Sequence, residues 1–275
     1  METNMLATSF ALQWGPGICG FMVAMALFGC TLGQFMFYLL SFPKDLKSLK
    51  LSVVLLLVVD ALHTYCVTAL YWKYLGLCHG VTSPPCPTVL PWEMLASVLL
   101  SYFMSCMVKS FYAHRVFIIS ERNYLLAGLI TATTATEFVL GMLCVNVAFI
   151  DQSATALYST PWSARSAVVS ACCDILITGS VFFYLRAGRR ETRRRYNYFR
   201  QLMLVFVNMG LFTCVIAIGW CLLYVLQNGN DYIAFPTTFI CKSYANSMLA
   251  VLNARKSMRE RDRELCMVGL STISG

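Results

Sequence analysis

Two long stretches of the chain carry no formal charge, and they limit what the chain can fold into. Residues 3–43 contain no Asp, Glu, Lys or Arg, and neither do residues 201–230. About 20 apolar residues are enough for a helix to cross the hydrocarbon layer of a bilayer. Of the 275 residues, 58% are hydrophobic and 12% are charged, whereas about a quarter are charged in a soluble domain. These values predict an integral membrane protein.

Seven segments of helical length lie between stretches that are rich in Gly, Pro, Asn and charge, as turns are. The predicted transmembrane helices are 17–41, 50–72, 92–118, 123–149, 162–185, 201–227 and 232–253. A membrane β-barrel would need short segments of alternating polarity, which the sequence lacks. The expected fold class is all-α: a bundle of seven transmembrane helices over 1–255, followed by a basic tail over 256–275. The N-terminus lacks the basic region of a signal peptide, so we expect the first helix to be retained.

Lys and Arg are distributed unequally between the two sides of this predicted bundle. The basic residues on one side are Lys44, Lys47, Lys50, Arg115, Arg122, Arg186, Arg189, Arg190, Arg193, Arg194, Arg195, Arg200, Arg255, Lys256, Arg259, Arg261 and Arg263. The loops on the opposite side hold only Lys73. Because cytoplasmic loops carry the excess of Lys and Arg, we expect the N-terminus outside and the C-terminus in the cytoplasm. The expected location is the plasma membrane or another membrane of the secretory pathway.

The predicted cytoplasmic loop 186–200 contains the densest run of basic residues. This basic surface consists of Arg189, Arg190, Arg193, Arg194 and Arg195. Basic residues beside a membrane attract anionic lipid headgroups, so membrane lipids are the first expected partner. A docking surface for a cytosolic protein is the alternative interpretation of the same loop. The net charge of +8 reflects membrane topology, and we expect no nucleic-acid partner.

Two cysteines stand apart from those in the apolar runs. Cys78 and Cys86 share the predicted outer loop between the second and third helices. Outside the cytoplasm the conditions favour disulfides, so these residues are candidates for a small bridge. The sequence leaves open whether they pair.

Signatures of catalysis or metal binding are missing from the sequence. It has no HExxH, GxSxG or paired-cysteine zinc pattern, and His63, His79 and His114 lie on different segments. We therefore expect no catalytic residue, no metal site and no cofactor, and we expect that the protein is not an enzyme.

Ionisable residues lie near the middle of several predicted helices, where each suggests a functional site because a charge is costly there. The candidate intramembrane polar cluster is Asp60, His63, Asp174, Lys242 and Asn246. Residues three or four positions apart share a helix face, which links Asp60 to His63 and Lys242 to Asn246. Glu137 is also central, and Lys109 is expected closer to the cytoplasmic side.

This polar cluster allows more than one interpretation. It is either an internal ion pair that fixes the packing of the helices, or a polar cavity for a ligand, a proton or an ion. The leading functional hypothesis is a protein of receptor-like topology that senses a small ligand. The alternative is a transporter or channel for a proton or small solute. A retinal protein, with its Schiff base on Lys242, is a less favoured third hypothesis.

The helix ends lack the Asp/Glu-Arg-Tyr and Asn-Pro-x-x-Tyr motifs of the common receptor class. Instead the chain carries FGCTLGQFMFYLLSFPKDLKSLK, VVDALH, FYAHRVFIIS, CCDILITGSVFFYLR, VNMGLFTCV and KSYANSMLAVLNARKSMR, in this order. Over residues 15–260 these motifs resemble a fungal family of seven-transmembrane proteins from mushroom-forming basidiomycetes, catalogued as domain of unknown function 6534. The resemblance implies a seven-helix membrane fold and no assigned activity.

By this resemblance a set of polar and aromatic residues occupies family motif positions. They are Gln34, Asp45, Asp60, Phe111, Tyr112, Arg115, Ser120, Asp174, Asn208, Gly210, Lys242, Asn246, Asn253 and Arg255. The chain departs from the family at Lys109, where glutamine is more frequent, and at Met209, where threonine is frequent. The extra charge of Lys109 is expected to alter any pocket near it.

Overall fold

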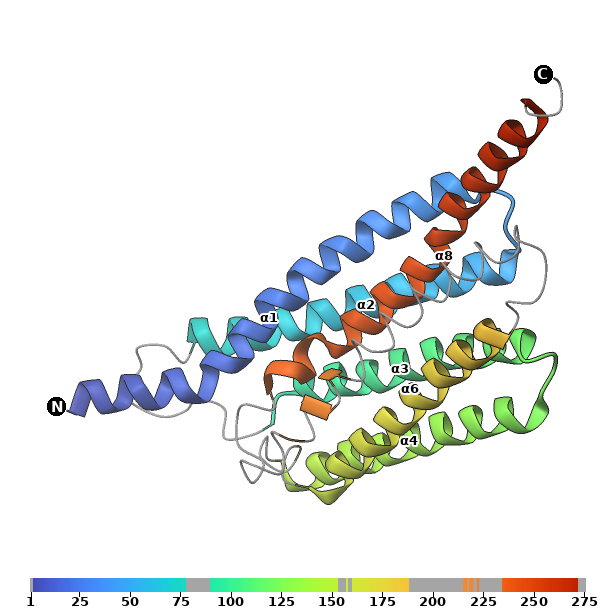
Figure 1. The fold of residues 1–275 in the computed structure, drawn as a ribbon. Helices are drawn as coiled ribbons and strands as arrows, with labels where there is room; N and C mark the ends of the chain where they lie inside the picture. The colour runs from blue at the N-terminus through green and yellow to red at the C-terminus, as the bar shows by residue number, and fades with distance from the viewer. Residues whose placement is uncertain are drawn as a thin grey trace.

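The computed structural model of the chain describes residues 2–77, 90–152, 157, 160–187, 215–216, 218–219, 222 and 234–271. The regular elements within these ranges are all helical and pack as a bundle (Figure 1). They are α1 (Glu2–Ser41), α2 (Lys47–Trp72) with the π-helical turn η1 (Lys73–Leu77), α3 (Trp92–Ile119), α4 (Tyr124–Asp151), α6 (Pro161–Ala187) and α8 (Ala234–Ser271).

Five of these helices are long and apolar enough to cross a membrane. Their apolar segments are Gly15–Ser41, Lys47–Gly76, Trp92–Ile119, Tyr124–Asp151 and Pro161–Tyr184. They overlap the first five predicted transmembrane helices, which confirms the expectation of an all-helical membrane fold for the described residues. The predicted helix 201–227, the arginines of the loop 186–200 and the cysteine pair of the outer loop lie outside the described residues. Seven helices and the orientation of the termini stay predictions.

Apolar side chains are exposed on the outside of the helix bundle, and charged side chains are buried inside it. Leu40 of α1 is 80% exposed and Leu125 of α4 is 81% exposed, whereas Lys109 and Lys242 are 0% and 1% exposed. In a bilayer, lipid tails solvate the exposed leucines, and polar groups have to find partners inside the bundle. This distribution is the one that a lipid environment favours.

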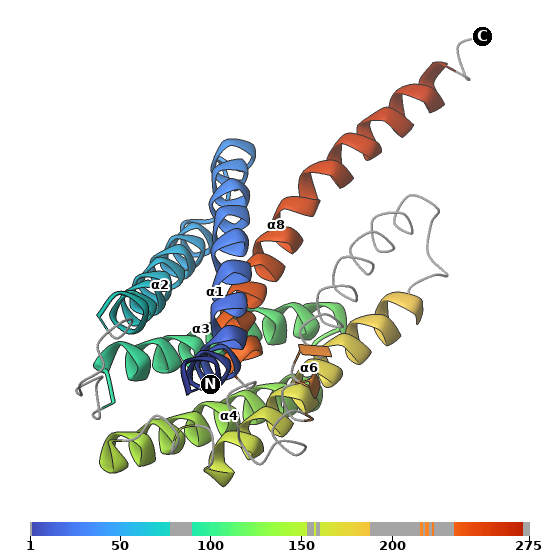
Figure 2. The same cartoon turned by 90° about the vertical axis from the view of Figure 1, so that its left-hand side faces the viewer.

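The helix α8 lies among the other helices. Its residues 241–249 are all buried, and it contacts α1, α2 and α3. Figures 1 and 2 both show α1 alongside it. It is not one of the five apolar helices. A helix that faces protein on most sides does not need lipid-compatible side chains, so it can carry the Lys, Asn and Ser residues that the sequence places there.

The same helix continues past the end of the predicted transmembrane segment at 253. It runs without a break to Ser271 and projects beyond the other helices in both views (Figure 2). The stretch RERDREL has no Gly or Pro and is composed mostly of strong helix formers. The predicted basic tail therefore begins as a helical extension of α8.

Polar contacts fix the helix ends on the side that the sequence predicts to be cytoplasmic. Arg255 Nη2 of α8 lies 2.7 Å from Asp45 Oδ2 in the turn between α1 and α2, and the Tyr38 hydroxyl donates to the same oxygen at 3.1 Å. Asn123 caps α4, because its Oδ1 accepts from the third residue of that helix, and its Nδ2 donates to the Tyr184 hydroxyl of α6 at 3.2 Å.

The close packing of α1 against α8 at Gly20 depends on the absence of a side chain there. A Cβ there would lie 2.5 Å from the Phe235 carbonyl oxygen, and backbone cannot rotate out of the way. We expect Gly20→Ala to cost about 1–3 kcal/mol of stability. The control is Gly29→Ala on the same helix, where a Cβ meets nothing within 4 Å. This control should keep or raise stability, by up to about 1 kcal/mol. Thermal unfolding of the purified variants measures both, and equal melting temperatures would contradict the close packing.

Candidate functional site

Lys242 of α8 is joined to α2 by three hydrogen bonds. Its Nζ donates to Asp60 Oδ1 at 2.6 Å, to the Asp60 carbonyl at 2.6 Å and to Thr64 Oγ1 at 2.5 Å. An ammonium has three hydrogens, so these acceptors use all of them. The centroid of the Phe28 ring of α1 lies 5.0 Å from the same Nζ. Protein groups therefore satisfy Lys242 fully, and we call Lys242 with Asp60 the α2–α8 pair.

Asn246 and His63 lie beside this pair. Asn246, one turn after Lys242, donates to Thr31 Oγ1 and to a backbone carbonyl of α1, each at 3.0 Å. His63 is 2% exposed, and its Nδ1 has no hydrogen-bond partner among the described residues; the same holds for Asp60 Oδ2. Asn246 thus connects α8 to α1, while α2 keeps two buried atoms with unused hydrogen-bonding capacity.

Lys109 of α3 forms a second buried centre with α4 and α6. Its Nζ donates to Glu137 Oε2 at 2.5 Å and to Ser170 Oγ at 2.7 Å, and it lies 3.5 Å from Asp174 Oδ1. Ser105, one turn before Lys109, donates to the other Glu137 oxygen at 2.9 Å. One ammonium therefore lies between two carboxylates from different helices.

Tyr244 of α8 completes this second centre. Its hydroxyl donates to Asp174 Oδ2 at 2.9 Å and lies 3.2 Å from Ser170 Oγ. A hydroxyl has one hydrogen, and that of Tyr244 goes to Asp174, so Ser170 is the donor across the 3.2 Å contact. Side chains from α3, α4, α6 and α8 thus converge here. We call Lys109, Glu137, Asp174 and Tyr244 the four-helix cluster.

The structure divides the predicted polar cluster between these two centres. Asp60, His63, Lys242 and Asn246 lie at or beside the α2–α8 pair, whereas Asp174 lies in the four-helix cluster. The carboxylate that binds the α8 lysine is the one on α2. The carboxylate on α6 faces the α3 lysine, Lys109, which is expected from its position in the sequence to lie closer to the cytoplasmic side.

Helix geometry explains this division. Successive helical residues are rotated by about 100°, so Lys242 and Tyr244 point in directions about 200° apart. One side of α8 therefore meets α2, and the opposite side meets α6. Helical side chains also lean toward the N-terminus, which brings the ammonium of Lys109 back toward the central carboxylates. The spacing of Ser105 and Lys109, one turn apart, was the signal in the sequence for a polar face on α3.

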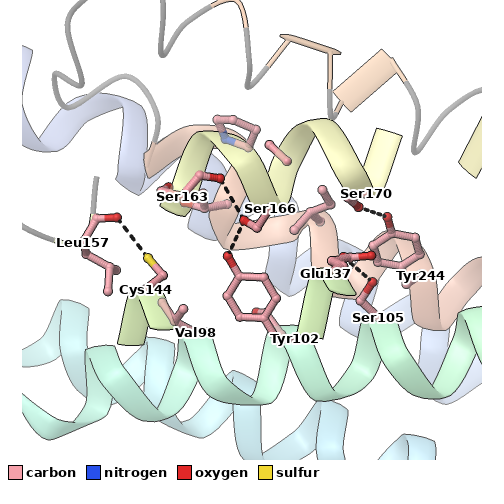
Figure 3. Close-up of a pocket in the computed structure, with 15 residues that line it drawn as sticks. Val98, Tyr102, Ser105, Glu137, Cys144, Leu157, Ser163, Ser166, Ser170 and Tyr244 are labelled. Atoms are coloured by element: carbon pink, nitrogen blue, oxygen red, sulfur yellow. Dashed lines mark hydrogen bonds between the residues drawn. The ribbon is translucent and has the colours of Figure 1, made fainter. Parts of the chain in front are cut away.

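A cavity of about 110 Å³ lies next to the four-helix cluster. Its described walls come from α3, α4, α6, the first turns of α8 and Leu157. Figure 3 shows Glu137, Ser105 and Tyr244 at one end of it and Cys144 and Leu157 at the other. The second end lies toward the side that the sequence predicts to be outside. The cavity thus leads from that side to a buried carboxylate.

Tyr102 forms the middle of the cavity wall. Its hydroxyl lies 2.8 Å from Ser166 Oγ, and Ser166 in turn donates to the Ser163 carbonyl at 2.8 Å (Figure 3). A Cβ at Gly141 of α4 would lie 2.5 Å from atoms of the Tyr102 ring. Gly141 therefore provides the space in which the ring lies, and the ring limits the width of the cavity.

The polar groups that the described lining residues present are hydroxyl groups, the Cys144 thiol and the Glu137 carboxylate. Lys242 and Asp60 are not among the described residues that line it. In the part of the chain that the structure describes, no group of three His, Cys, Asp or Glu residues is placed to hold a metal ion.

Five apolar helices and two buried charged centres define a multi-pass membrane protein with an all-helical fold. Residues 170–257 match the model of a family described as "Family of unknown function (DUF6534)", which supports the resemblance found from the motifs. The matched range includes the α6 and α8 members of both centres, and the partners on α2, α3 and α4 precede it. No curated protein and no solved structure matches the chain.

Proposed function

We propose that this multi-pass membrane protein has a receptor-like topology and binds a small ligand in the cavity beside the four-helix cluster. The observation that carries the proposal is that the cavity ends at Glu137, whose carboxylate accepts a hydrogen bond from Lys109 at 2.5 Å. A ligand there contacts a group on which four helices converge, so it favours one arrangement of these helices over others.

The size of the cavity supports a ligand smaller than a typical drug. Drug-sized ligands occupy pockets of about 300–1,000 Å³, whereas this cavity has a volume of about 110 Å³. The helix α6 carries Ser170 and Asp174 and ends at Ala187, directly before the basic loop. A ligand-dependent shift of α6 would therefore move the start of the loop 186–200. Anionic lipid headgroups and a cytosolic protein are the proposed partners of that loop.

Filling the cavity tests the proposal. Ala167 of α6 lines it, and Ala167→Leu should exclude the ligand while keeping or raising stability, by about 0.5–2 kcal/mol, because it fills empty space. The matched control is Val168→Leu on the next residue, which is 48% exposed on the outer surface. Mass spectrometry of small molecules that co-purify with the two variants and the unchanged protein measures the effect.

The proposal requires a small molecule that accompanies the unchanged protein and the control but not Ala167→Leu. If all three preparations carry the same molecules, the cavity is not a binding site. Reconstituted vesicles separate the transporter alternative from a receptor. A transporter moves the bound compound or protons across the membrane, and a receptor binds without flux.

A further inference from the structure

We propose that the ligand of this cavity is a small organic cation of the alkylammonium class, with an ammonium head against Glu137 and a short apolar tail. This inference rests on the proposed function, because it names the chemical class of the molecule that the cavity binds. Three features of the cavity lead to it: the charge of its lining, the direction of its hydrogen bonds and the acceptor sites that Glu137 keeps.

The lining presents one formal charge, and that charge is negative. Among the described lining residues, Glu137 is the only Asp, Glu, Lys or Arg, and none is His. Lys109 lies behind Glu137 with its side chain 0% exposed, and it is not among the lining residues. An anionic ligand would meet a carboxylate with no compensating cation on the described walls. A cationic ligand would meet an opposite charge in a site of low dielectric, where the attraction is strong.

Several hydroxyl groups of the lining offer acceptors rather than donors, because their hydrogens are already donated within the protein. Ser101 donates to the Ser97 carbonyl at 3.0 Å, Ser105 donates to Glu137 at 2.9 Å, and Ser166 donates to the Ser163 carbonyl at 2.8 Å. Each serine has one hydrogen, so these bonds use their donor capacity and leave lone pairs free.

The hydroxyl hydrogens of Tyr102 and Tyr244, two tyrosines of the lining, are also donated to other side chains. Tyr244 donates to Asp174, and Tyr102 must be the donor to Ser166 Oγ, because the Ser166 hydrogen is already given to a carbonyl. The Cys144 thiol likewise donates to the Leu157 carbonyl at 3.5 Å. A ligand that brings its own hydrogens is therefore complementary to these groups, and an ammonium brings three.

Glu137 keeps acceptor sites for a cationic ligand. Its Oε2 accepts from Lys109 at 2.5 Å, and its Oε1 accepts from Ser105 at 2.9 Å. An ionised carboxylate has about four lone-pair sites, so it can accept further hydrogen bonds from an ammonium. The rings of Tyr102 and Tyr244 would add attraction for a cation.

Three probe compounds, each with four carbon atoms but with different head groups, test the ligand class: n-butylammonium, n-butanol and butyrate. Each is titrated in the millimolar range, where ligands this small bind, into the purified full-length protein in detergent, and calorimetry gives the Kd. We expect n-butylammonium to bind about tenfold or more tightly than n-butanol, because its hydrogen bonds are charge-assisted, and butyrate to bind least. Binding of all three should be weakened in Ala167→Leu and retained in Val168→Leu.

Glu137→Gln removes the carboxylate from the cavity while Lys109 keeps Asp174 and Ser170 as partners. In this variant the affinity for n-butylammonium should fall about tenfold or more, and that for n-butanol should change little. The matched control is Glu93→Gln, which removes a buried carboxylate that pairs with Lys73 and is not among the described lining residues. This control should leave the preference for the ammonium head unchanged.

The outcomes separate the ligand class from the proposed function. If n-butanol or butyrate binds as tightly as n-butylammonium, and Ala167→Leu abolishes that binding, the ligand class is wrong and the cavity is still a binding site. If none of the probes binds, or if Glu137→Gln keeps the full preference for n-butylammonium, the ligand class is also wrong. The binding function itself fails only if no co-purifying molecule is lost in Ala167→Leu.

Discussion

Lys109→Met should destabilise the protein by about 3–5 kcal/mol, because it leaves two buried carboxylates without their cation. The Lys109 side chain is 0% exposed, and its Nζ lies 2.5 Å from Glu137 Oε2 and 3.5 Å from Asp174 Oδ1. Methionine fits a similar volume and has no charge, so the variant tests the charge rather than the packing. The fraction of folded monomer in size-exclusion chromatography and the melting temperature measure the loss.

A second substitution in the same cluster should recover part of this stability. Lys109→Met with Glu137→Gln leaves one buried carboxylate, Asp174, which still accepts from the Tyr244 hydroxyl. Lys109→Met with Asp60→Asn should recover nothing, because Asp60 belongs to the other centre. As a surface control, Lys44→Met changes an exposed lysine in the turn between α1 and α2, and it should change stability by less than about 1 kcal/mol. Equal losses for Lys44→Met and Lys109→Met would contradict the buried cluster.

Lys242→Met should also cost about 3–5 kcal/mol, because it leaves the Asp60 carboxylate buried and uncompensated. The loss includes three hydrogen bonds from Nζ to Asp60 and Thr64. Lys242 is not among the described lining residues of the cavity. The folded fraction of Lys242→Met should therefore bind n-butylammonium with an unchanged Kd. Thermal unfolding and calorimetry on the same preparation measure both quantities.

The partner of Lys242 can be identified by rescue. Lys242→Met with Asp60→Asn removes both charges and should restore most of the melting temperature, because replacing both members of a buried pair is often close to neutral. Lys242→Met with Asp174→Asn should be less stable than Lys242→Met alone, because it disrupts the second centre as well. Recovery with Asp174→Asn and not with Asp60→Asn would show that the assignment of the two lysines is reversed.

The membrane fold and the identity of its buried charged residues were predictable from the sequence. Predominantly apolar segments of more than 20 residues cross a bilayer as helices unless they form a closed barrel, so the first five predicted helices overlap helices of the structure. Asp60, Asp174 and Lys242 were candidates because a charge at mid-depth needs a partner. The prediction of a basic tail after residue 255 did not include the helical extension of α8, because charge alone does not specify a helix; the high helix propensity of RERDREL does favour one.

The sequence by itself determined that the helices cross a membrane and that certain charges lie between them, since both follow from composition and spacing along one helix. Only the tertiary structure decided which charges meet. Lys242 contacts α2, and Tyr244, two positions on, contacts α6, because the rotation of α8 and its place among its neighbours direct them to opposite sides. The pairing of Lys109 with Glu137, and the cavity beside them, depend on how four separate helices pack, which periodicity within one helix does not specify.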